Sequence, residues 1–493
     1  MIRRIRGLCA LAILVAPVSG RFSASAQGPS IIGEVQSWFA QTSRRAPGKW
    51  GVVVADQNGN IIWEVNASEP MIPASTVKLL TTGFARTVVG SEARRATRVV
   101  GDGQIDPASG TWLGRWALEL NGDPSLDRPD RSGPTLVDLA HQLAAIGVRR
   151  LVGPLTITTS AGEAKSVFPS VWSSRFRGRS YAPPIGPVTL NENIISFAVA
   201  PGYKVGAKAL IVGEAPMGVA GLVTVTATTV AGRKSSLRFG AQAGGRYIVS
   251  GKVGLSSRPR RYTAVASDPS AVLEAVWRRA TAEAGITWVS TTALLSSEPS
   301  PRRVLAEVAS GTFDSLAHEI NTRSLNIGAE LLLLWGGGPK SPADALMAHV
   351  RKVTGLSDGM HLVDGSGLSS DDRMTPLIFT TYLAKIPQTP GGHNFPMLLP
   401  ANGSGTLRRL ASGLPEPGVV RAKTGTLSNA ATLVGYLGRS DGTLLIAAMY
   451  NGGSVYAARQ AQWALFRRLG ANGIVIPSDD ATATGGPVVP DHK

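Results

Sequence analysis

A serine and a lysine three positions apart, Ser75 and Lys78 in the stretch PASTVKLLT (73–81), have the types and spacing of a nucleophile and its base. A serine hydroxyl is a poor nucleophile and needs a base within hydrogen-bond reach. Residues three apart on a helix lie on the same face, so this spacing would place Lys78 beside Ser75. Taken alone, the pair also fits a serine and a lysine on a buried structural helix.

Lys78 can act as a base only while its amine is neutral. An unperturbed lysine has a pKa of about 10.4 and is protonated at neutral pH. Desolvation by the apolar residues around it, together with a second cation such as Lys423, would lower that pKa. A position for Ser75 near a helix N-terminus would also bring backbone N–H groups to a developing oxyanion.

Two further motifs follow along the chain, Ser324-Leu325-Asn326 and Lys423-Thr424-Gly425, the second of which is extended by Thr426. Ser324 can relay a proton to a leaving amine, and Asn326 offers a donor and an acceptor to a substrate amide. Lys423, Thr424 and Thr426 on a strand can bind a terminal carboxylate. In isolation, the first motif also fits a helix cap or turn, and the second a solvated edge strand.

The three motifs occur in the order found in serine penicillin-binding proteins and β-lactamases. With the long insertion between Ser75 and Ser324, the chain resembles the low-molecular-mass class C penicillin-binding proteins, the D-alanyl-D-alanine carboxypeptidase/endopeptidase family (peptidase family S13). The resemblance extends to NGDPSL (121–126), YAPPIGPVTLNENIISFAVAPG (181–202), DGSGLSSDDRMTP (364–376), LPANGSGTLRRL (399–410) and VRAKTGTLSNAATLVGYL (420–437). Two positions depart from it: Leu325 replaces a usually polar residue, and Asp372 stands where the family often has asparagine.

The resemblance implies a serine-type D-Ala-D-Ala carboxypeptidase, with D,D-endopeptidase activity as a further expectation. A peptidoglycan stem peptide would acylate Ser75 with Lys78 as the base, and β-lactam antibiotics would acylate the same serine. Ser324 and Asn326 would form the second motif. Lys423, Thr424, Gly425 and Thr426 would form the strand that binds the substrate carboxylate, and the backbone amides of Ser75 and Thr426 would form the oxyanion hole.

The resemblance also implies a mixed α/β fold. A transpeptidase/β-lactamase-like domain, with a five-stranded antiparallel sheet flanked by helices, would be split by a large insertion of two β-rich domains. The predicted boundaries are a signal peptide (1–26), the catalytic domain (27–91 and 302–477), inserted domain II (92–203 and 258–301), nested domain III (204–257) and a disordered tail (478–493).

Patterns along the chain predict the elements that position the motifs. GVVVADQNGNIIWEV (51–65) predicts two strands around an Asn-Gly turn, followed by a buried helix with Pro73 in its first turn. The periodic apolar residues of 313–335 and 454–470 predict helices, and 418–438 and 443–453 predict strands. Glycines and short Thr/Val-rich stretches predict a separate β-rich block over 92–300.

The first 26 residues run from Arg3, Arg4 and Arg6 through an apolar stretch to Ala26, which predicts a cleaved signal peptide and a periplasmic or secreted location. No later stretch approaches about 18 uninterrupted apolar residues, so no transmembrane anchor is expected in the mature chain. The only cysteine, Cys9, would leave with the signal peptide, which excludes disulfides and thiol chemistry.

The net charge of +17 suits an anionic envelope or wall polymer as the surroundings of the protein. The basic residues lack interleaved aromatics, so no nucleic-acid partner is expected. The six histidines show no metal-ligand spacing and the glycines no dinucleotide fingerprint, so neither metal nor cofactor is expected. Two alternatives stay open: a β-lactamase, which needs an efficient water-activating base, and a non-catalytic wall-binding or scaffolding protein of the same fold.

Overall fold

The computed structural model describes residues 30–130, 132–291 and 303–478. The predicted signal peptide and all but the first residue of the predicted tail lie outside these ranges. Within the three ranges, no helix is both long and apolar enough to cross a membrane.

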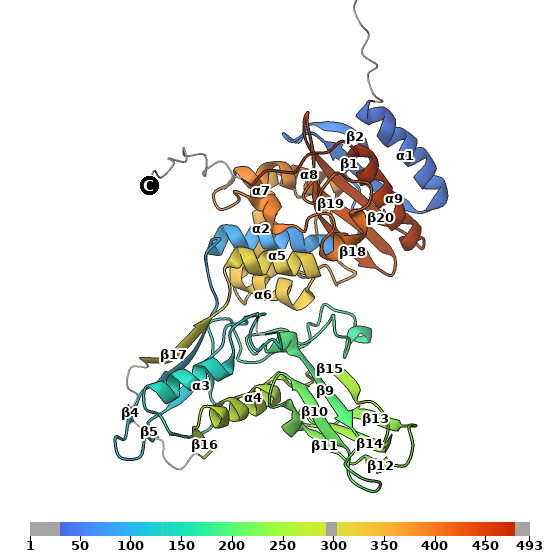
Figure 1. Ribbon diagram of the computed structural model, residues 1–493. Helices are drawn as coiled ribbons and strands as arrows, with labels where there is room; N and C mark the ends of the chain where they lie inside the picture. The colour runs from blue at the N-terminus through green and yellow to red at the C-terminus, as the bar shows by residue number, and fades with distance from the viewer. Residues whose placement is uncertain (1–29, 131, 292–302, 479–493) are drawn as a thin grey trace, which may run out of the picture.

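A five-stranded sheet is assembled from both ends of the chain (Figure 1). In spatial order its strands are β18 (Val420–Leu427), β19 (Ala430–Arg439), β20 (Gly442–Asn451), β1 (Lys49–Ala55) and β2 (Ile61–Val65). Each neighbouring pair is antiparallel. The predicted five-stranded antiparallel sheet is therefore confirmed, as are the strand pair of 51–65 and the C-terminal strands.

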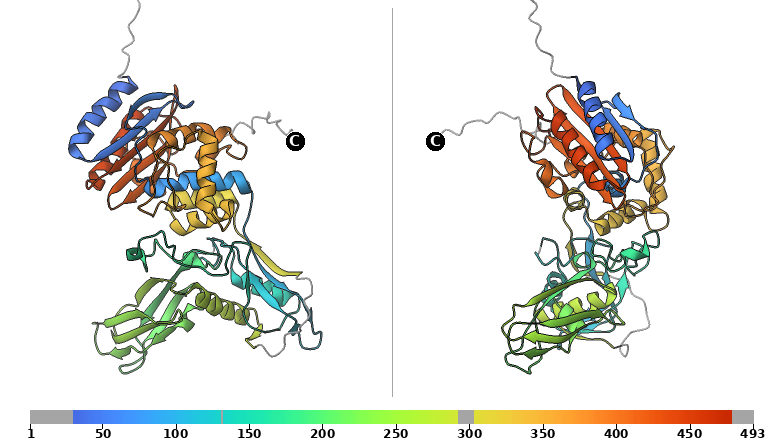
Figure 2. Two further views of the ribbon diagram at one scale, coloured as in Figure 1. Left: turned by 180° about the vertical axis from the view of Figure 1, so that it is seen from behind. Right: turned by 90° about the vertical axis from the view of Figure 1, so that its right-hand side faces the viewer.

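Helices cover both faces of this sheet, which explains why its inner strands β19, β20 and β1 are mostly apolar. Val52 and Val54 belong to the core under α1 (Ile31–Arg45) and α9 (Val455–Leu469), whereas Val53 and Ala55 belong to the core on the other face. Successive residues of a strand point to opposite faces, so a strand covered on both sides is apolar at every position. Figure 2 shows the layers from two further sides.

The helices of the second face carry the first two motifs. They are α2 (Val77–Val89), α5 (Phe313–Arg323), α6 (Asn326–Gly337), α7 (Pro342–Thr354) and α8 (Pro376–Lys385). The predicted burial of α2 is confirmed, because Leu79, Leu80 and Phe84 pack into the core under the sheet. The helical segment predicted over 313–335 is confirmed, and it is divided in two because Ser324 adopts a left-handed conformation (φ 58°) that ends α5.

The insertion between α2 and α5 is built from small sheets, as its composition predicts. Their strands are β3 (Ala96–Gly101), β6 (Trp116–Glu119), β8 (Ile157–Thr158) and β17 (Arg303–Ala309); β4 (Gln104–Ile105) and β5 (Trp112–Leu113); β7 (Arg150–Val152) and β16 (Thr287–Val289); β9 (Ile194–Ala200), β10 (Leu210–Ala215) and β15 (Arg260–Val265); and β11 (Val223–Val225), β12 (Thr228–Val230), β13 (Ser236–Ala241) and β14 (Tyr247–Gly254). Two helices not expected from the sequence, α3 (Leu136–Ala145) and α4 (Pro269–Glu283), pack among them.

Two hydrophobic clusters stabilise the insertion. The larger contains α3, α4 and tryptophans such as Trp277, and the smaller lies between the β9 and β14 sheets around Phe197 and Val249. Tyr247 comes from β14, a strand of the sandwich around the smaller cluster, but its side chain packs into the larger cluster. The sandwich is therefore packed directly against the rest of the insertion. The boundaries of domains II and III stay predictions.

The insertion is attached by two paired strands. β3 leads into it and β17 leads out, and the two pair antiparallel from Ala96–Ala309 to Gly101–Arg303. Figure 1 shows them side by side between the two parts of the molecule. At the base of this ribbon, Ser310 Oγ accepts the backbone N–H of Arg95 (2.9 Å). A hydrogen-bonded ribbon transmits position better than a flexible linker, because its backbone is already fixed.

We expect Trp277→Ala to destabilise the insertion by about 3–5 kcal/mol, because its indole is fully buried in the larger cluster. Urea denaturation followed by tryptophan fluorescence and circular dichroism measures this change. Tyr203→Ala is the control: its side chain is 82% exposed, and the free energy of unfolding should change by less than about 0.5 kcal/mol. Equal effects of the two substitutions would contradict this account of the core.

Candidate active site

Ser75 lies on a 3₁₀ turn (Ala74–Thr76) that runs directly into α2. Two hydroxyls fix this turn, because Thr76 Oγ1 and Thr432 Oγ1 both donate to the Pro73 carbonyl (2.6 and 2.7 Å). Ala74 has a positive φ of 48°, a conformation that strains a residue with a side chain and is found where surrounding contacts hold it. Pro73 precedes the turn, so its predicted place in the first turn of α2 was wrong.

Lys78 is fully buried, and its Nζ has three hydrogen-bond partners. They are the hydroxyl of Ser75 (3.0 Å), the side-chain carbonyl of Asn326 (2.6 Å) and the backbone carbonyl of Ser366 (2.6 Å). The two carbonyls can only accept, so each takes one N–H of the amine. A neutral amine has two N–H bonds, and its lone pair is then left for the Ser75 hydroxyl. This arrangement suits removal of a proton from Ser75.

Burial lowers the pKa of Lys78 from 10.5 to about 8, and the charges of Asp364, Glu330 and Asp372 oppose that change. Burial also lowers the pKa of Lys423, well below 10.5, and the positive charges of Lys78 and Arg459 lower it further. Desolvation therefore accounts for the lowered pKa of Lys78 as expected, whereas repulsion between the lysines acts on Lys423. With a pKa of about 8, roughly one Lys78 in ten is neutral at pH 7.

Ser324 and Asn326 lie at the break between α5 and α6. Ser324 Oγ accepts from Lys423 Nζ (2.9 Å), and Asn326 donates its side-chain N–H to the backbone carbonyl of Tyr181 in the insertion (2.8 Å). Asn326 is thus held between Lys78 on one side and the insertion on the other. Leu325 packs against the core, so its replacement of a polar residue leaves the cleft unchanged.

Strand β18 forms the edge of the sheet beside the Ser75 turn. A side chain at Gly425 would collide with Thr432 and with the backbone of Pro73 and Ser75, so only glycine allows this approach. Thr426 is exposed toward the cavity, and Lys423 is fully buried beneath it.

Arg459 of α9 supports the same strand from behind. Its guanidinium donates to the carbonyl of Gly425 (2.5 Å), to Thr426 Oγ1 (3.0 Å) and to the carbonyl of Thr432 (2.8 Å). Burial lowers the pKa of Arg459 to about 10, so it stays protonated at neutral pH. A permanent positive charge therefore lies next to the position where a substrate carboxylate would bind.

The loop that starts at Asp364 forms the floor of the site. Asp364 accepts hydrogen bonds from the backbone N–H groups of Ser366, Gly367 and Ser369 (2.6–3.0 Å) and from the Trp172 indole of the insertion (3.0 Å). Gly367 has φ 72° and touches the Ala74 backbone, where a side chain would not fit. This turn fixes the Ser366 carbonyl that holds Lys78.

Two further carboxyls, Glu330 and Asp372, are buried near this loop. Burial raises the pKa of both, and the negative charge of Asp364 adds to the effect. Asp372 Oδ1 accepts the backbone N–H of Val363 (2.8 Å). The side-chain oxygen of an asparagine could accept the same hydrogen bond, so Asp372 keeps this one contact of an amide.

A cavity of about 440 Å³ opens above Ser75. Ser75, Ser324, Asn326 and Thr426 line it together with residues of the insertion, Ser173, Arg175, Phe176 and Tyr181. The structure thus brings the three motifs together at one cavity, with Lys78 and Lys423 buried under it. Thr424 is 7% exposed and, like Gly425, is outside the lining, so a direct contact of either residue with substrate stays a prediction.

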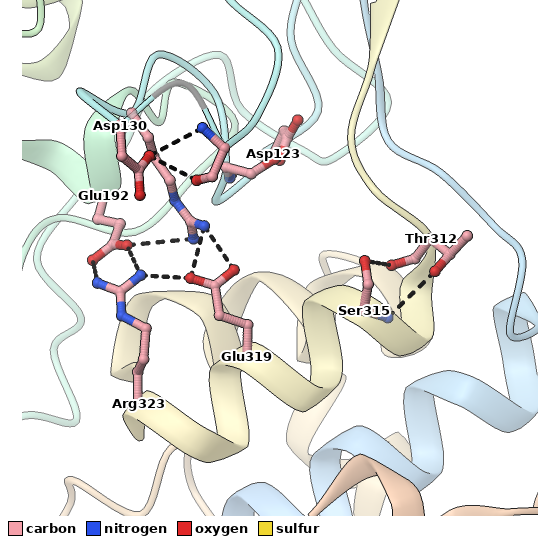
Figure 3. A network of polar contacts seen from close by, with 10 residues as sticks. Asp123, Asp130, Glu192, Thr312, Ser315, Glu319 and Arg323 are labelled. Atoms are coloured by element: carbon pink, nitrogen blue, oxygen red, sulfur yellow. Dashed lines mark hydrogen bonds and ion pairs between the residues drawn. The ribbon is translucent and has the colours of Figure 1, made fainter. Parts of the chain in front are cut away.

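Four charged residues join the insertion to the end of α5 (Figure 3). Arg128 Nη1 contacts both carboxylate oxygens of Glu319 (2.7 and 2.6 Å), and Arg323 makes two hydrogen bonds to Glu192 (2.6 and 3.0 Å) and one to Glu319 (2.6 Å). Glu319 and Arg323 belong to the last two turns of α5, and the next residue is Ser324. The network therefore holds the turn from which Ser324 projects.

The insertion contributes Glu192 to this network from a strained turn of the backbone. Asn191, Glu192 and Asn193 have positive φ angles of 46°, 58° and 55°, which residues with side chains seldom adopt in succession. Hydrogen bonds from Asn193 Nδ2 to the carbonyls of Pro184 and Val188 (3.0 and 3.2 Å) hold the turn. Strain retained beside a reactive centre indicates that the orientation of Glu192 is specified by its surroundings.

Arg459, Tyr181, Arg175 and the charged network were not expected at the site, because none of them belongs to a short sequence motif. Across the described ranges, no three His, Cys, Asp or Glu residues are grouped so that they could hold a metal ion.

Known proteins provide an independent comparison. The sequence signature of the family described as D-Ala-D-Ala carboxypeptidase 3 (S13) matches residues 34–469. A D-alanyl-D-alanine carboxypeptidase of Actinomadura sp. (strain R39) is 26% identical over 442 residues, which cover 85% of this chain and 80% of that protein.

A crystal structure of penicillin binding protein 4 from Haemophilus influenzae has a similar fold. It superimposes with a TM-score of 0.69 at 22% identity, over 87% of this chain and 98% of that one. A second structure of that protein, complexed with a novel β-lactam, gives a TM-score of 0.64 at 22% identity, over 87% of this chain and 99% of that one. The predicted fold class is therefore confirmed, and the span of the signature shows that this chain belongs to the D-Ala-D-Ala carboxypeptidase 3 (S13) family.

Proposed function

We propose that this protein is a serine-type D-Ala-D-Ala carboxypeptidase that acts on peptidoglycan stem peptides through an acyl-enzyme on Ser75, and that it also cleaves D-alanyl cross-links. The observation that carries the proposal is the environment of Lys78, whose two carbonyl partners leave its lone pair for the Ser75 hydroxyl. The predicted signal peptide (1–26) and this substrate class together support a periplasmic or secreted location.

In the acylation step, Lys78 takes the Ser75 proton while Ser75 Oγ attacks the carbonyl carbon of the penultimate D-alanine. The backbone N–H groups of Ser75 and Thr426 stabilise the oxyanion. As the tetrahedral intermediate collapses, the C–N bond breaks and the leaving nitrogen needs a proton. Ser324, whose hydroxyl contacts Lys423 (2.9 Å) and lines the cavity, delivers this proton. Ser324 is reprotonated by the proton that Lys78 took from Ser75, so Lys78 is neutral again before deacylation. Free D-alanine departs, and the acyl group remains on Ser75.

In the deacylation step, a water molecule replaces the leaving amine. Lys78 removes a proton from the water, the ester bond to Ser75 breaks, and the proton returns to Ser75 Oγ. Until D-alanine departs, its carboxylate is bound by Thr426 and by the positive charge of Arg459, whose guanidinium contacts Thr426 Oγ1 (3.0 Å). β-Lactams would enter the same sequence, with their carboxylate in this position.

The composition of the cavity disfavours the β-lactamase alternative. Among the described residues that line it, none is an aspartate or glutamate. A β-lactamase needs a base positioned to activate water on the acyl-enzyme, and a carboxylate beside the serine would supply it. The non-catalytic alternative is disfavoured by the contact of Lys78 with Ser75 and of Lys423 with Ser324.

We expect fluorescent penicillin to label the purified protein stably, and Ser75→Ala to abolish the label while the fold is retained. Gel fluorescence measures the labelling, and enzymatic detection of D-alanine measures turnover of a pentapeptide. Ser370→Ala is the matched control, since Ser370 also lines the cavity and has no contact with Lys78. Rapid release of hydrolysed penicillin would instead indicate a β-lactamase, and an unlabelled wild type would contradict both enzymes.

The acylation rate should depend on pH through Lys78. Protonated Lys78 cannot accept the Ser75 proton, so kcat/KM for a pentapeptide should rise about tenfold per pH unit below about 8 and level off above it. Stopped-flow measurements of penicillin acylation provide a second readout on the free enzyme. A rate that is constant from acid to alkaline pH would argue against Lys78 as the base.

Loss of the network at the end of α5 should selectively slow substrates that need a proton on their leaving group. Glu192→Gln removes the charge that Arg323 contacts from the insertion. We expect acylation by a D-Ala-D-Ala amide to slow about tenfold, or about 1.4 kcal/mol. Acylation by the matching D-thiolactate thioester should change little, because a thiolate leaves without a proton.

The control for this prediction is Glu274→Gln, which removes a solvent-exposed ion pair with Arg278 in the same insertion. Equal slowing of amide and thioester would indicate general damage to the site instead of misplacement of Ser324.

A further inference from the structure

The β-sandwich at the end of the insertion concentrates positive charge. Residues 201–262 contain ten lysines and arginines and one acidic residue, Glu214. All ten basic residues are exposed. Within the described ranges, none of the ten forms an ion pair with a carboxylate. Their charge is therefore not neutralised by the protein itself.

Strand register places part of this charge in one row. Lys208 pairs with Thr228, Thr228 with Lys252, and Lys252 with Ser236 across neighbouring strands. Paired residues of adjacent strands project from the same face, and all four residues are exposed. Arg238, two residues beyond Ser236 on β13, lies on this face as well. We call Lys208, Thr228, Ser236, Arg238 and Lys252 the basic face.

The opposite side of the same strands is the hydrophobic core of the sandwich. Leu237, Val249 and Val253 point inward, into the cluster that includes Phe197 of the facing sheet. The basic face is therefore the outer surface of a packed sandwich and is presented with fixed spacing. Neighbouring strands are about 4.8 Å apart, so Lys208 and Lys252 project about 10 Å from each other with a threonine between them.

We infer that the basic face binds an anionic envelope polymer whose repeating charges are phosphates. Ammonium and guanidinium groups at regular intervals, with hydroxyl donors between them, match phosphate oxygens along an extended chain. A membrane-docking face would present large apolar side chains for insertion, whereas the basic face consists of charged and hydroxyl side chains. Leu210, two residues from Lys208, is 50% exposed, so vesicle binding is one of the outcomes that the test below distinguishes. A face for single-stranded nucleic acid would present aromatic rings for stacking, which the basic face lacks.

The placement of the basic face allows this binding and catalysis to occur together. In Figures 1 and 2, β12, β13 and β14 lie at the end of the insertion far from β18 and the motif helices. A polymer bound there leaves the cavity above Ser75 open. Binding would hold the enzyme close to wall-linked peptides and raise their effective concentration without any new contact in the cavity.

The test uses fluorescently labelled poly(glycerol phosphate) and the full mature chain, with anisotropy measured at increasing NaCl concentrations. The variant Lys208→Ser/Arg238→Ser/Lys252→Ser should bind at least about tenfold more weakly. The slope of log affinity against log salt should fall in magnitude by about 2, as expected for three lost phosphate contacts on a flexible chain.

The matched control is Lys340→Ser/Arg351→Ser/Lys352→Ser, which removes the same three charges from exposed positions at and before α7. It should change the affinity less than about twofold. If both triple variants weakened binding equally, the net charge of the protein alone would explain the affinity, and the proposal would be overturned. Undetectable binding by the wild type at low salt would also overturn it, as would tighter binding to phosphatidylglycerol vesicles or to an oligonucleotide that is lost in the first variant.

Discussion

A lysine amine buried without a carboxylate in direct contact imposes the main constraint on this structure. Taking an ammonium out of water costs several kcal/mol unless its charge is compensated, and a group in that position tends to release its proton instead. The direct partners of Lys78 Nζ are a hydroxyl and two carbonyls, and Asp364, Glu330 and Asp372 act on it only through their fields. These fields keep the pKa of Lys78 from falling further, so the amine can still return its proton.

The surrounding fold supplies the partners of this amine from distant parts of the chain. Ser75 precedes α2, Asn326 begins α6 and Ser366 belongs to the floor loop, so the base is complete only when these three segments have packed. The insertion contacts the partners of Lys78 and not Lys78 itself. The Tyr181 carbonyl holds the amide of Asn326, and the Trp172 indole holds Asp364. The insertion therefore helps to position the residues of the site.

The motif residues could be identified from the sequence because each acts through its side chain, so its residue type is visible in the sequence. The order of the three motifs along the chain made the identification more specific. The inner strands of the sheet were predictable for a different reason, since burial on both faces makes β1, β19 and β20 mostly apolar. Tyr181 could not be found in this way, because it acts through its backbone carbonyl. The break at Ser324 was missed because Leu325 continues the apolar pattern of the helices around it. Arg128 and Glu319 are 191 residues apart, and nothing local in either segment marks them as partners.

The assembly of one sheet from both ends of the chain has a consequence for the timing of activity. Ser75 is made early, whereas Lys423, the β18 strand and Arg459 come near the end of the chain. At roughly 5–20 residues per second, a ribosome needs on the order of half a minute to travel from one to the other. Throughout that interval the serine has neither its carboxylate-binding strand nor the contact between Lys423 and Ser324. A chain that ends before β18 therefore lacks part of the site, and under the proposed function it would be inactive until the last strands are in place.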